Sequence, residues 1–393
     1  MNDAVIVDVV RTASGKGKPG GAFSDTHPTD LLAEVLRALL ERNGLESMQI
    51  DDVLVGCVSQ TGEQSGNVAR NALLAAGFDE RVPGVSIDRQ CGSSQQAAHF
   101  AAQGVIAGAY DIVIAAGVEV MSRVPLGSSA NGASPFGAGI ASRYPHGLVN
   151  QGVSAELIAA KWDFNREQLD RFAAESHRRA AAAAASGAFA RELLAVTLPD
   201  GRVADADETI RPETTTSALA QLKPAFYTEE AALRFPQIDW EITAGNSSPL
   251  TDAASGALIM SDSMALKLGL APRARFHSFA VVGDDPLFML TGPIPATHKI
   301  LERSGLAFAD LDVYEVNEAF ASVPLAWAHE FDADPAKLNP LGGAIALGHA
   351  VGASGTRLLG TLLHQLEATG GRYGLQTMCE GGGMANATII ERL

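Results

Sequence analysis

The sequence has few cysteines, few aromatic residues and a shortage of positive charge. Among its 393 residues the only cysteines are Cys57, Cys91 and Cys379, an odd number at wide spacing that argues against a disulfide framework and is typical of a reducing compartment. Lys and Arg number 29 against 45 Asp and Glu, a formal net charge of −16. This balance argues against nucleic acid or an anionic membrane as the main partner.

Long apolar runs are also missing. No uncharged stretch approaches the roughly 20 residues that a membrane-spanning helix needs. The opening MNDAVIVDVVRT has no charged segment followed by an apolar core, and the closing ERL is not a peroxisomal address. We therefore expect a cytoplasmic protein without a signal peptide. Glycine is plentiful, with 40 residues, and predicts tight turns and close packing of helices on sheets.

A repeat organises the chain. LERNGL at Leu40–Leu45 returns as LERSGL at Leu301–Leu306, each after a helical pattern and before a strand pattern. The same shift of 261 residues carries Cys91 onto Gly352, where a second Gly-rich turn opens a helix. Repeats of this kind indicate two halves with one plan. Because strands and helices alternate in each half, the pattern predicts mainly parallel sheets.

Residues 122–246 interrupt this plan. Ser122–Gly152 is rich in Gly, Ser, Ala and Pro, and a loop of this length is usually functional. The stretch that follows, from Ser154 to Phe189, reads as one charged amphipathic helix. The predicted division is residues 1–121 with 247–271 as one half, 122–246 as an insertion and 272–393 as the other half.

Cys91 begins the stretch CGSS, between a strand pattern at Val82–Ile87 and a helix of small residues. On a strand-to-helix turn, its sulfur would face unpaired backbone N–H groups and the positive end of the helix dipole. Both favour the nucleophilic thiolate. The alternative is a buried structural cysteine, and this stretch alone does not decide between the two.

Three further segments stand at strand ends or in the Gly-rich turns that follow, where open α/β sheets place their sites. They are Asn317–Phe320, Gly342–His349 with the following GASG, and Cys379–Gly383. His349 can serve as a base for a cysteine nucleophile, and a second thiol at Cys379 can act as an acid or base. Glycine N–H groups in CEGGG can form an oxyanion hole, and Asn317 can orient a water or a carbonyl. The alternatives are a core histidine, a plain glycine turn and a helix-capping asparagine.

These motifs resemble those of the thiolase family, the 3-ketoacyl-CoA thiolases and acetyl-CoA acetyltransferases. CGSS, NEAF, GGAIALGH with GASG, and CEGGG match its four active-site motifs in order, and the match covers essentially the whole chain. The resemblance implies an α/β thiolase fold, with two pseudo-repeated mixed-sheet halves in a layered αβαβα arrangement. It also implies an inserted loop domain that covers coenzyme A, and a homodimer or homotetramer.

The resemblance further implies a mechanism. Cys91, activated by His349, would attack the ketone of a 3-ketoacyl-CoA and keep the acyl group as a thioester. Cys379 would protonate the departing acetyl-CoA (or propionyl-CoA), and free CoA would then take the acyl group. In reverse, the same steps form a carbon–carbon bond. His349 and a water on Asn317 would hold one oxyanion, and the N–H groups of Cys91 and Gly381 would hold the other.

By the same resemblance, the ligands are acyl-CoA substrates and coenzyme A as co-substrate, with no permanently bound cofactor and no metal. Ser248 would lie beside the pantetheine and Lys223 near a CoA phosphate.

Several positions depart from the family pattern: Ser94, Pro249, Ala350, Glu380 and Ala385. Asn150-Gln151 replaces the His-Met pair of short-chain biosynthetic thiolases, which argues against a dedicated acetoacetyl-CoA synthase. GEQS, QCGSSQQA and MSRVPLG are shared with members that act on steroid side chains or rings. We therefore expect a degradative thiolase for a medium, branched or cyclic acyl group. A carboxylate at Glu380 would raise the pKa of the neighbouring Cys379 thiol.

Four other functions remain open at this stage. They are a decarboxylating condensing enzyme of the same fold, a non-catalytic CoA- or lipid-binding subunit, a short-chain acetoacetyl-CoA thiolase and a cysteine hydrolase. The condensing enzymes use Cys with two His, or with His and Asn. This chain instead has a second cysteine, Cys379, directly after the strand pattern GLQTM, which favours the thiolase. The hydrolase reading lacks any feature that favours water over carbon acids.

Overall fold

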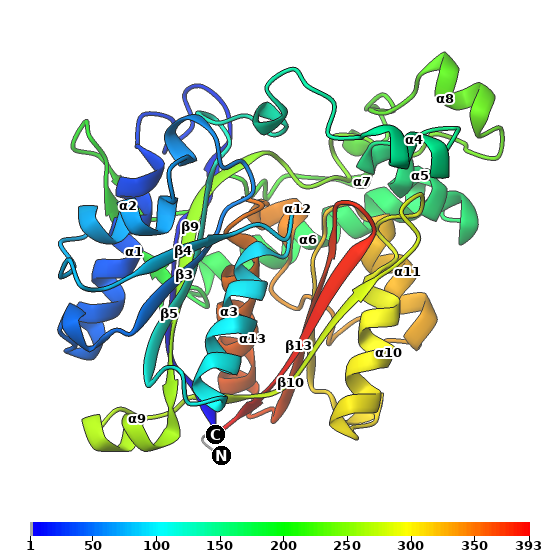
Figure 1. The fold of residues 1–393 in the computed structure, drawn as a ribbon. Coiled ribbons are helices and arrows are strands. Elements are labelled where there is room, and N and C mark those ends of the chain that lie inside the picture. Colours follow the sequence, from blue (N-terminus) through cyan, green and yellow to red (C-terminus); the bar gives the residue numbers. More distant parts are fainter. Residues whose placement is uncertain (1–2) are drawn as a thin grey trace.

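The computed structural model describes residues 3–393 and has five layers, in which two sheets alternate with three layers of helices (Figure 1). The middle layer is a pair of helices enclosed by the two sheets. The main helices are α1 (Pro28–Asn43) and α2 (Val68–Ala75) on one outer face, α3 (Ser93–Ile106) and α13 (Ser354–Thr369) in the middle, and α10 (Pro293–Ser304) and α11 (Ser322–Phe331) on the other outer face.

The two sheets have the same strand order. The first contains β1 (Ala4–Thr12), β9 (Thr251–Ser261), β5 (Ile112–Val120), β3 (Asp52–Gly56) and β4 (Gly84–Ile87), and the second contains β10 (Ala274–Gly283), β13 (Met384–Arg392), β12 (Tyr373–Glu380) and β11 (Val313–Val316). The orders β1-β9-β5-β3 and β10-β13-β12-β11 are equivalent. A short antiparallel contact between β1 and β10 joins the sheets at Val5 and Ile6. The predicted pair of repeated halves is therefore confirmed.

The prediction of mainly parallel sheets is wrong, because the sheets are mixed. Parallel pairs occur between β3 and β4, β3 and β5, and β11 and β12, whereas β9 and β13 pair antiparallel with both neighbours. The reason is visible at β12 and β13, which only Gly381–Gly383 separate. Parallel pairing needs a crossover connection of a dozen or more residues. The three residues between β12 and β13 therefore allow only an antiparallel pair.

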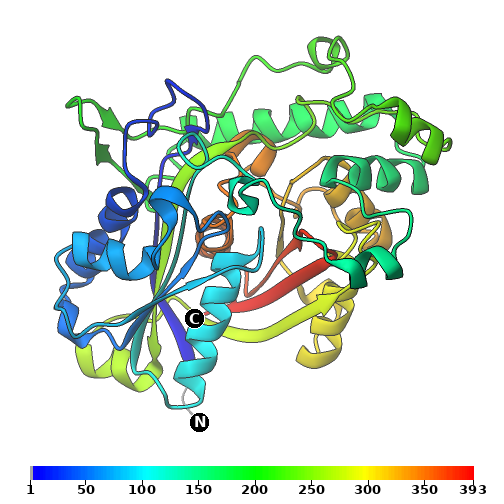
Figure 2. The same ribbon diagram turned by 45° about the horizontal axis from the view of Figure 1, so that its top comes forward.

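Residues between β5 and β9 lie across one end of both halves (Figure 2). Their elements are α4 (Ala138–Arg143), α5 (Gln151–Lys161), α6 (Arg166–Ala185), β6 (Leu193–Leu194), β7 (Val196–Thr197), β8 (Val203–Ala204), α7 (Thr216–Leu219) and α8 (Glu229–Arg234). Outside this segment the chain also forms the short elements β2 (Gly15–Lys16), α9 (Asp262–Leu268) and α12 (Ala344–Leu347). None of the helices within residues 3–393 is long and apolar enough to cross a membrane.

The single helix predicted from Ser154 to Phe189 is wrong. The chain forms α5 and α6, with a break in which Asp163 adopts a left-handed φ of 55°. Asn165 then starts α6 as its N-cap, and its side chain and that of Gln168 accept each other's backbone N–H groups. Such a capping box stabilises a helix start, so local chemistry overrides the continuous amphipathic pattern.

The two middle helices meet almost backbone to backbone at their first turns. A Cβ atom on Gly355 would lie 2.1 Å from the backbone nitrogen of Gln95, and one on Gly117 would lie 2.2 Å from the carbonyl oxygen of Gly352. The backbone N–H of Thr356 donates to Ser94 Oγ over 3.1 Å. Only glycine leaves room for this approach, so the starts of α3 and α13 are held together.

This packing predicts that Gly355→Ala destabilises the protein. Alanine in a helix is normally favourable by nearly 1 kcal/mol relative to glycine, but here its methyl group meets backbone that cannot move aside. We expect a loss of about 3 kcal/mol in the free energy of unfolding, measured by denaturant titration. Gly139→Ala in α4 is the matched control, because nothing lies within 4 Å of its added methyl group. Equal stability of the two variants would contradict the proposed close packing.

Candidate functional site

The four predicted motifs meet at one end of the two middle helices. Cys91 lies on the turn between β4 and α3, with Gly92 at the helix N-cap. Asn317 directly follows β11, and its backbone N–H donates to Thr377 in β12 over 3.1 Å. Cys379 is the last residue but one of β12, and His349 directly follows the α12 turn. All of these side chains are buried.

The two thiols are both buried, and Cys91 lies close enough to influence the pKa of Cys379. Burial raises the pKa of Cys91, the charge of Glu380 raises it further, and hydrogen bonds from the backbone N–H groups of Cys91 and Gly381 lower it, so that the result is about 12. Burial also raises the pKa of Cys379 well above its usual value, and the nearby Cys91 adds to the effect. Both residues therefore rest as thiols. As predicted, N–H groups lower the pKa of Cys91, but burial outweighs them, so the net shift favours the thiol.

His349 is held as a neutral base. Burial lowers its pKa to about 3, and the positive charge of Arg357 contributes. Its Nδ1 lies 2.6 Å from Ser354 Oγ, and that hydroxyl is 2.9 Å from the carbonyl oxygen of Ala350. The serine proton therefore goes to the carbonyl, and His349 Nδ1–H donates to Ser354. Its Nε2 is then an acceptor, with Asn317 Nδ2 at 3.4 Å as the donor.

Glu318 holds Asn317–Phe320 against the segment that leads to His349. Its carboxylate accepts from Ser176 Oγ at 2.6 Å, Asn339 Nδ2 at 2.9 Å and the backbone N–H of Ile345 at 3.2 Å. Ser176 is in α6, and its Oγ also accepts from the backbone N–H of Gly343. The inserted segment therefore supports the site as well as lying over it.

Glu119 is a structural residue that the sequence analysis missed. Its buried carboxylate accepts the backbone N–H groups of Val58, Ser59 and Gly352, together with the side chain of Gln64. It thereby ties the turn before α13 to the first half. Within the strand pattern DIVIAAGVEVM, its only distinguishing signal was a charge in an otherwise apolar run.

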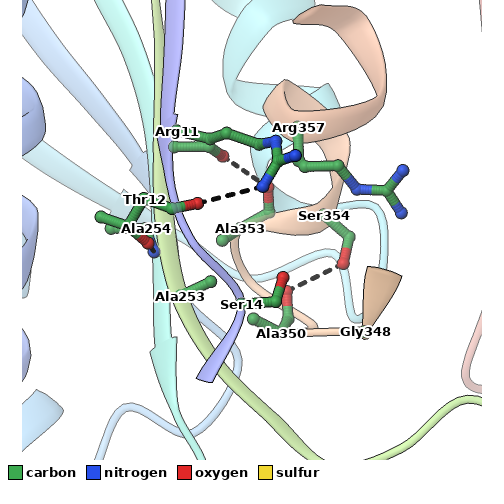
Figure 3. Close-up of a pocket in the computed structure, with 11 residues that line it drawn as sticks. Arg11, Thr12, Ser14, Ala253, Ala254, Gly348, Ala350, Ala353, Ser354 and Arg357 are labelled. Carbon is green, nitrogen blue, oxygen red and sulfur yellow. Dashed lines mark hydrogen bonds between the residues drawn. The ribbon is translucent and has the colours of Figure 1, made fainter. Parts of the chain in front are cut away.

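Ser354, which orients His349, was also missed, although GASG contains it. It borders a cavity of about 10 Å³ between β1, β9 and the start of α13. Figure 3 shows the Ser354 hydroxyl directed at Ala350 and the guanidinium of Arg357 turned away from Arg11. The cavity holds at most one water molecule.

The positions that depart from the family pattern fit the structure. Ser94 is buried and accepts the Thr356 N–H described above. Ala350 packs with Ala253 and Ala353. The carbonyl oxygen of Pro249 accepts from Thr251 Oγ1, which in turn accepts the backbone N–H of His349. None of these substitutions disturbs the four motifs.

The residues assigned to coenzyme A lie at the border of the site. The backbone N–H and hydroxyl of Ser248 both approach the carbonyl oxygen of Ala319, at 3.0 and 3.1 Å. Lys223 is exposed and, within the described residues, bonds to no other site residue. Three residues later, the Phe226 ring covers Gly152 and lies edge-on to Phe320, with ring centres 5.8 Å apart.

Two glutamines border Gly381, the glycine predicted to form an oxyanion hole. A Cβ atom on Gly381 would lie 2.9 Å from Gln90 Oε1 and 3.3 Å from Gln151 Nε2. The side chain of Gln151, part of the unusual Asn150-Gln151 pair, therefore reaches the catalytic region. Within residues 3–393 there is no cluster of His, Cys, Asp or Glu that could hold a metal ion.

Comparisons with known proteins agree with this geometry. Residues 4–263 match the model of the thiolase N-terminal domain, and residues 270–392 match that of the thiolase C-terminal domain. The chain is 46% identical to the steroid 3-ketoacyl-CoA thiolase FadA6 of Mycobacterium tuberculosis, over 100% of this chain and 95% of that protein. It is 43% identical to a 3-ketoacyl-CoA thiolase of Pseudoalteromonas translucida over the full length of both.

A solved structure shows the same fold. The crystal structure of the Bacillus anthracis acetyl-CoA acetyltransferase superposes with a TM-score of 0.89 at 35% sequence identity. The alignment covers 100% of this chain and 99% of that one. The predicted fold class is therefore confirmed.

The environment of His349 predicts that its imidazole stays neutral between pH 8 and pH 5. A pKa lowered to about 3 places the whole titration below this range, since protonation would put a charge in a buried site next to Arg357. Histidine-labelled NMR spectra should show no shift of the His349 ring signals across the range, with the signals assigned by their loss in His349→Asn. A titration with a midpoint near pH 6.5 would mean that the site is open to water.

Proposed function

Because the chain belongs to the thiolase family and is an acyltransferase that exchanges acyl groups between 3-ketoacyl-CoA and CoA, we propose that Cys91 carries the acyl group as a thioester. The observation that carries this proposal is the meeting of Cys91, Cys379, His349 and Asn317, with the backbone N–H groups of Cys91 and Gly381 bonded to the Cys91 sulfur. A plain structural cysteine needs none of these partners.

The neutral His349 starts the reaction. Its Nε2 accepts the proton of the Cys91 thiol, and the thiolate attacks the ketone carbon of the substrate. The ketone oxygen becomes an oxyanion that the N–H groups of Cys91 and Gly381 stabilise; loss of one such donor typically costs about 3 kcal/mol of activation energy. A raised thiol pKa makes this base necessary, because Cys91 does not ionise unaided at neutral pH.

Cys379 supplies the second proton. When the bond between the ketone carbon and the adjacent carbon breaks, its electron pair passes to the acetyl-CoA fragment as an enolate. The thiol of Cys379 protonates this carbon, and its pKa, raised by burial, keeps the proton in place until then. CoA then attacks the Cys91 thioester, and the Cys379 thiolate takes the proton of the CoA thiol. The Cys91 sulfur leaves as a thiolate and takes back the proton that His349 accepted in the first step. His349 with a water on Asn317 holds the thioester oxyanion.

We assign the CoA end to the inserted segment. Ser248 lies beside the segment Asn317–Phe320, and the ring of Phe226, three residues after Lys223, lies edge-on to Phe320. This arrangement supports pantetheine beside Ser248 and a CoA phosphate near Lys223. It also supports the division into residues 1–121 with 247–271, the CoA-covering loop domain 122–246, and residues 272–393. CoA is then a substrate that comes and goes, and no permanent cofactor takes part.

We also propose a homodimer or homotetramer in the cytoplasm. Strand β4 ends the first sheet, and apolar side chains at Val85, Leu74 and Phe100 are exposed on it and on the neighbouring helices. An exposed sheet edge with apolar side chains is a common association surface.

For the acyl group, we propose a bulky degradative substrate, branched or cyclic. The 46% identity to a steroid 3-ketoacyl-CoA thiolase supports this choice, as do the segments QCGSSQQA and MSRVPLG. A non-catalytic subunit has no support, because both thiols, the histidine and the asparagine are present and mutually placed.

The acyl-enzyme can be observed directly. On mixing with a 3-ketoacyl-CoA in the absence of free CoA, the intact mass of the protein should increase by the mass of the acyl group, and Cys91→Ala should show no increase. Cys57→Ala is the matched control, because Cys57 is equally buried but lies at the end of β3. It should load normally. An adduct on Cys91→Ala would overturn the assignment of the nucleophile.

A substrate panel tests the acyl group. We expect kcat/KM of thiolysis to be at least tenfold higher for a steroid-derived or other cyclic 3-ketoacyl-CoA than for acetoacetyl-CoA, a difference of about 1.4 kcal/mol in transition-state binding. The measurement is the rate of CoA-dependent cleavage at subsaturating substrate. A clear preference for acetoacetyl-CoA would instead favour the short-chain alternative.

A further inference from the structure

Glu380 lies on the opposite face of β12 from its neighbour Cys379. In the ladder between β12 and β13, Met378 pairs with Asn386, Cys379 with Ala385 and Glu380 with Met384. Side chains alternate along a strand, so Glu380 and Asn386 share one face and Cys379 takes the other. The shared face packs on the Cys91 turn: Asn386 Nδ2 donates to the carbonyl oxygen of Gly92 over 3.2 Å.

The carboxyl group of Glu380 is in direct contact with this turn. A Cβ atom on Gly92 would lie 2.0 Å from Glu380 Oε1 and 2.9 Å from Asn386 Nδ2. Gly92 is therefore the residue that makes room for the carboxyl group, immediately after Cys91. From the sequence we expected Glu380 to raise the pKa of Cys379 alone. In the structure its charge also raises the pKa of Cys91.

The carboxyl group is also unpaired. Glu380 is completely buried, and neither of its oxygens has a hydrogen-bond partner among residues 3–393. Two other polar atoms of the same neighbourhood are unpaired as well, Asn386 Oδ1 and Arg89 Nε. A buried, unpaired carboxylate is costly, whereas a protonated carboxyl group supplies the donor that Asn386 Oδ1 lacks.

We propose that Glu380 is a positioning residue that carries a proton in the working enzyme, and that loss of this proton holds Cys91 in its unreactive thiol form. The inference rests on Cys91 as the proposed nucleophile. The electrostatic reason is that a carboxylate in contact with Gly92 repels the developing thiolate at Cys91, whereas the protonated carboxyl group does not.

Charged and titratable groups approach Glu380 from two sides. Asp88, Arg89 and Cys91 lie on the β4–α3 turn, and Cys379 lies on its own strand; Asn386 on β13 is neutral. Burial raises the pKa of Glu380 most, Arg89 lowers it and Asp88 raises it, with a result of about 8. Below this pH the group is neutral and leaves Cys91 unaffected. Above it the carboxylate opposes the thiolate, so reactivity rises less steeply with pH than for an isolated thiol.

The test is the rate of Cys91 alkylation by iodoacetamide from pH 6 to pH 10, read by peptide mass spectrometry so that Cys91 and Cys379 are separated. In Glu380→Gln the ratio of the variant rate to the wild-type rate should be near one below pH 7 and should rise above pH 8. Each unit by which the carboxylate raises the Cys91 pKa corresponds to about tenfold in this ratio. A ratio that does not change with pH would overturn the proposal.

Glu315→Gln is the matched control. Glu315 in β11 is also completely buried, both of its oxygens are unpaired, and its pKa is raised to about 8 by burial, but it faces Arg357 and not the thiols. The ratio of the Glu315→Gln alkylation rate to the wild-type rate should not change with pH. If Glu380→Gln does not fold, Arg89→Gln serves instead: loss of the cation raises the Glu380 pKa further, so the change of slope in the alkylation profile moves to higher pH. No movement would contradict the inference.

A parallel assay keeps this inference separate from the proposed function. If the alkylation ratio rises with pH but Cys91→Ala retains thiolysis, Glu380 controls Cys91 and the nucleophile is wrongly assigned. If Cys91→Ala is inactive and the ratio is flat, the nucleophile stands and Glu380 is only structural.

Discussion

The site depends on the contact between the first turns of α3 and α13. Gly355 lies against the backbone of Gln95 in α3, and Gly117 in β5 lies against the backbone of Gly352 just before α13, each too close for a side chain. This contact places the turn of one half beside the equivalent turn of the other, so Cys91 from the first half and His349 from the second lie at one site. Two repeated halves therefore make one asymmetric site, in which the first supplies the proposed acyl carrier and the second supplies the proposed base and the second thiol.

Close packing also determines the electrostatics. Because the middle layer is enclosed by two sheets, every group at the helix starts loses water, and desolvation is the largest influence on the pKa values of Cys91, Cys379, His349 and Glu380. The thiols keep their protons and the imidazole stays neutral. Catalysis in such a site relies on fixed N–H groups and short proton transfers rather than on ions formed in advance.

The sequence predicted what is encoded locally. The repeat, the four motifs and the helix starts depend on neighbouring residues, and the family resemblance rested on the same segments. Two missed features are local: Ser354 contacts His349 and Ala350 within five residues, and the capping box at Asn165 breaks the predicted single helix. Glu119 was missed because its partners Val58 and Gly352 are distant in the sequence. The upward net shift of the Cys91 pKa was missed for a similar reason, since burial is a property of the assembled layers.

At Glu380, the alternation of side chains between the two faces of β12 decides which turn the carboxyl group contacts. Adjacent in sequence to Cys379, it suggested an effect on that thiol, and its charge does raise the pKa of Cys379. The strand alternation nevertheless turns its carboxyl group toward Gly92, into the space between β13 and the Cys91 turn. An apolar side chain would fill this space without any charge. A carboxyl group in the same space makes the reactivity of Cys91 depend on the proton of Glu380, which takes no part in the proposed catalytic steps. The reason is that two negative charges, on the thiolate and on the carboxylate, repel each other strongly when they are close together and buried.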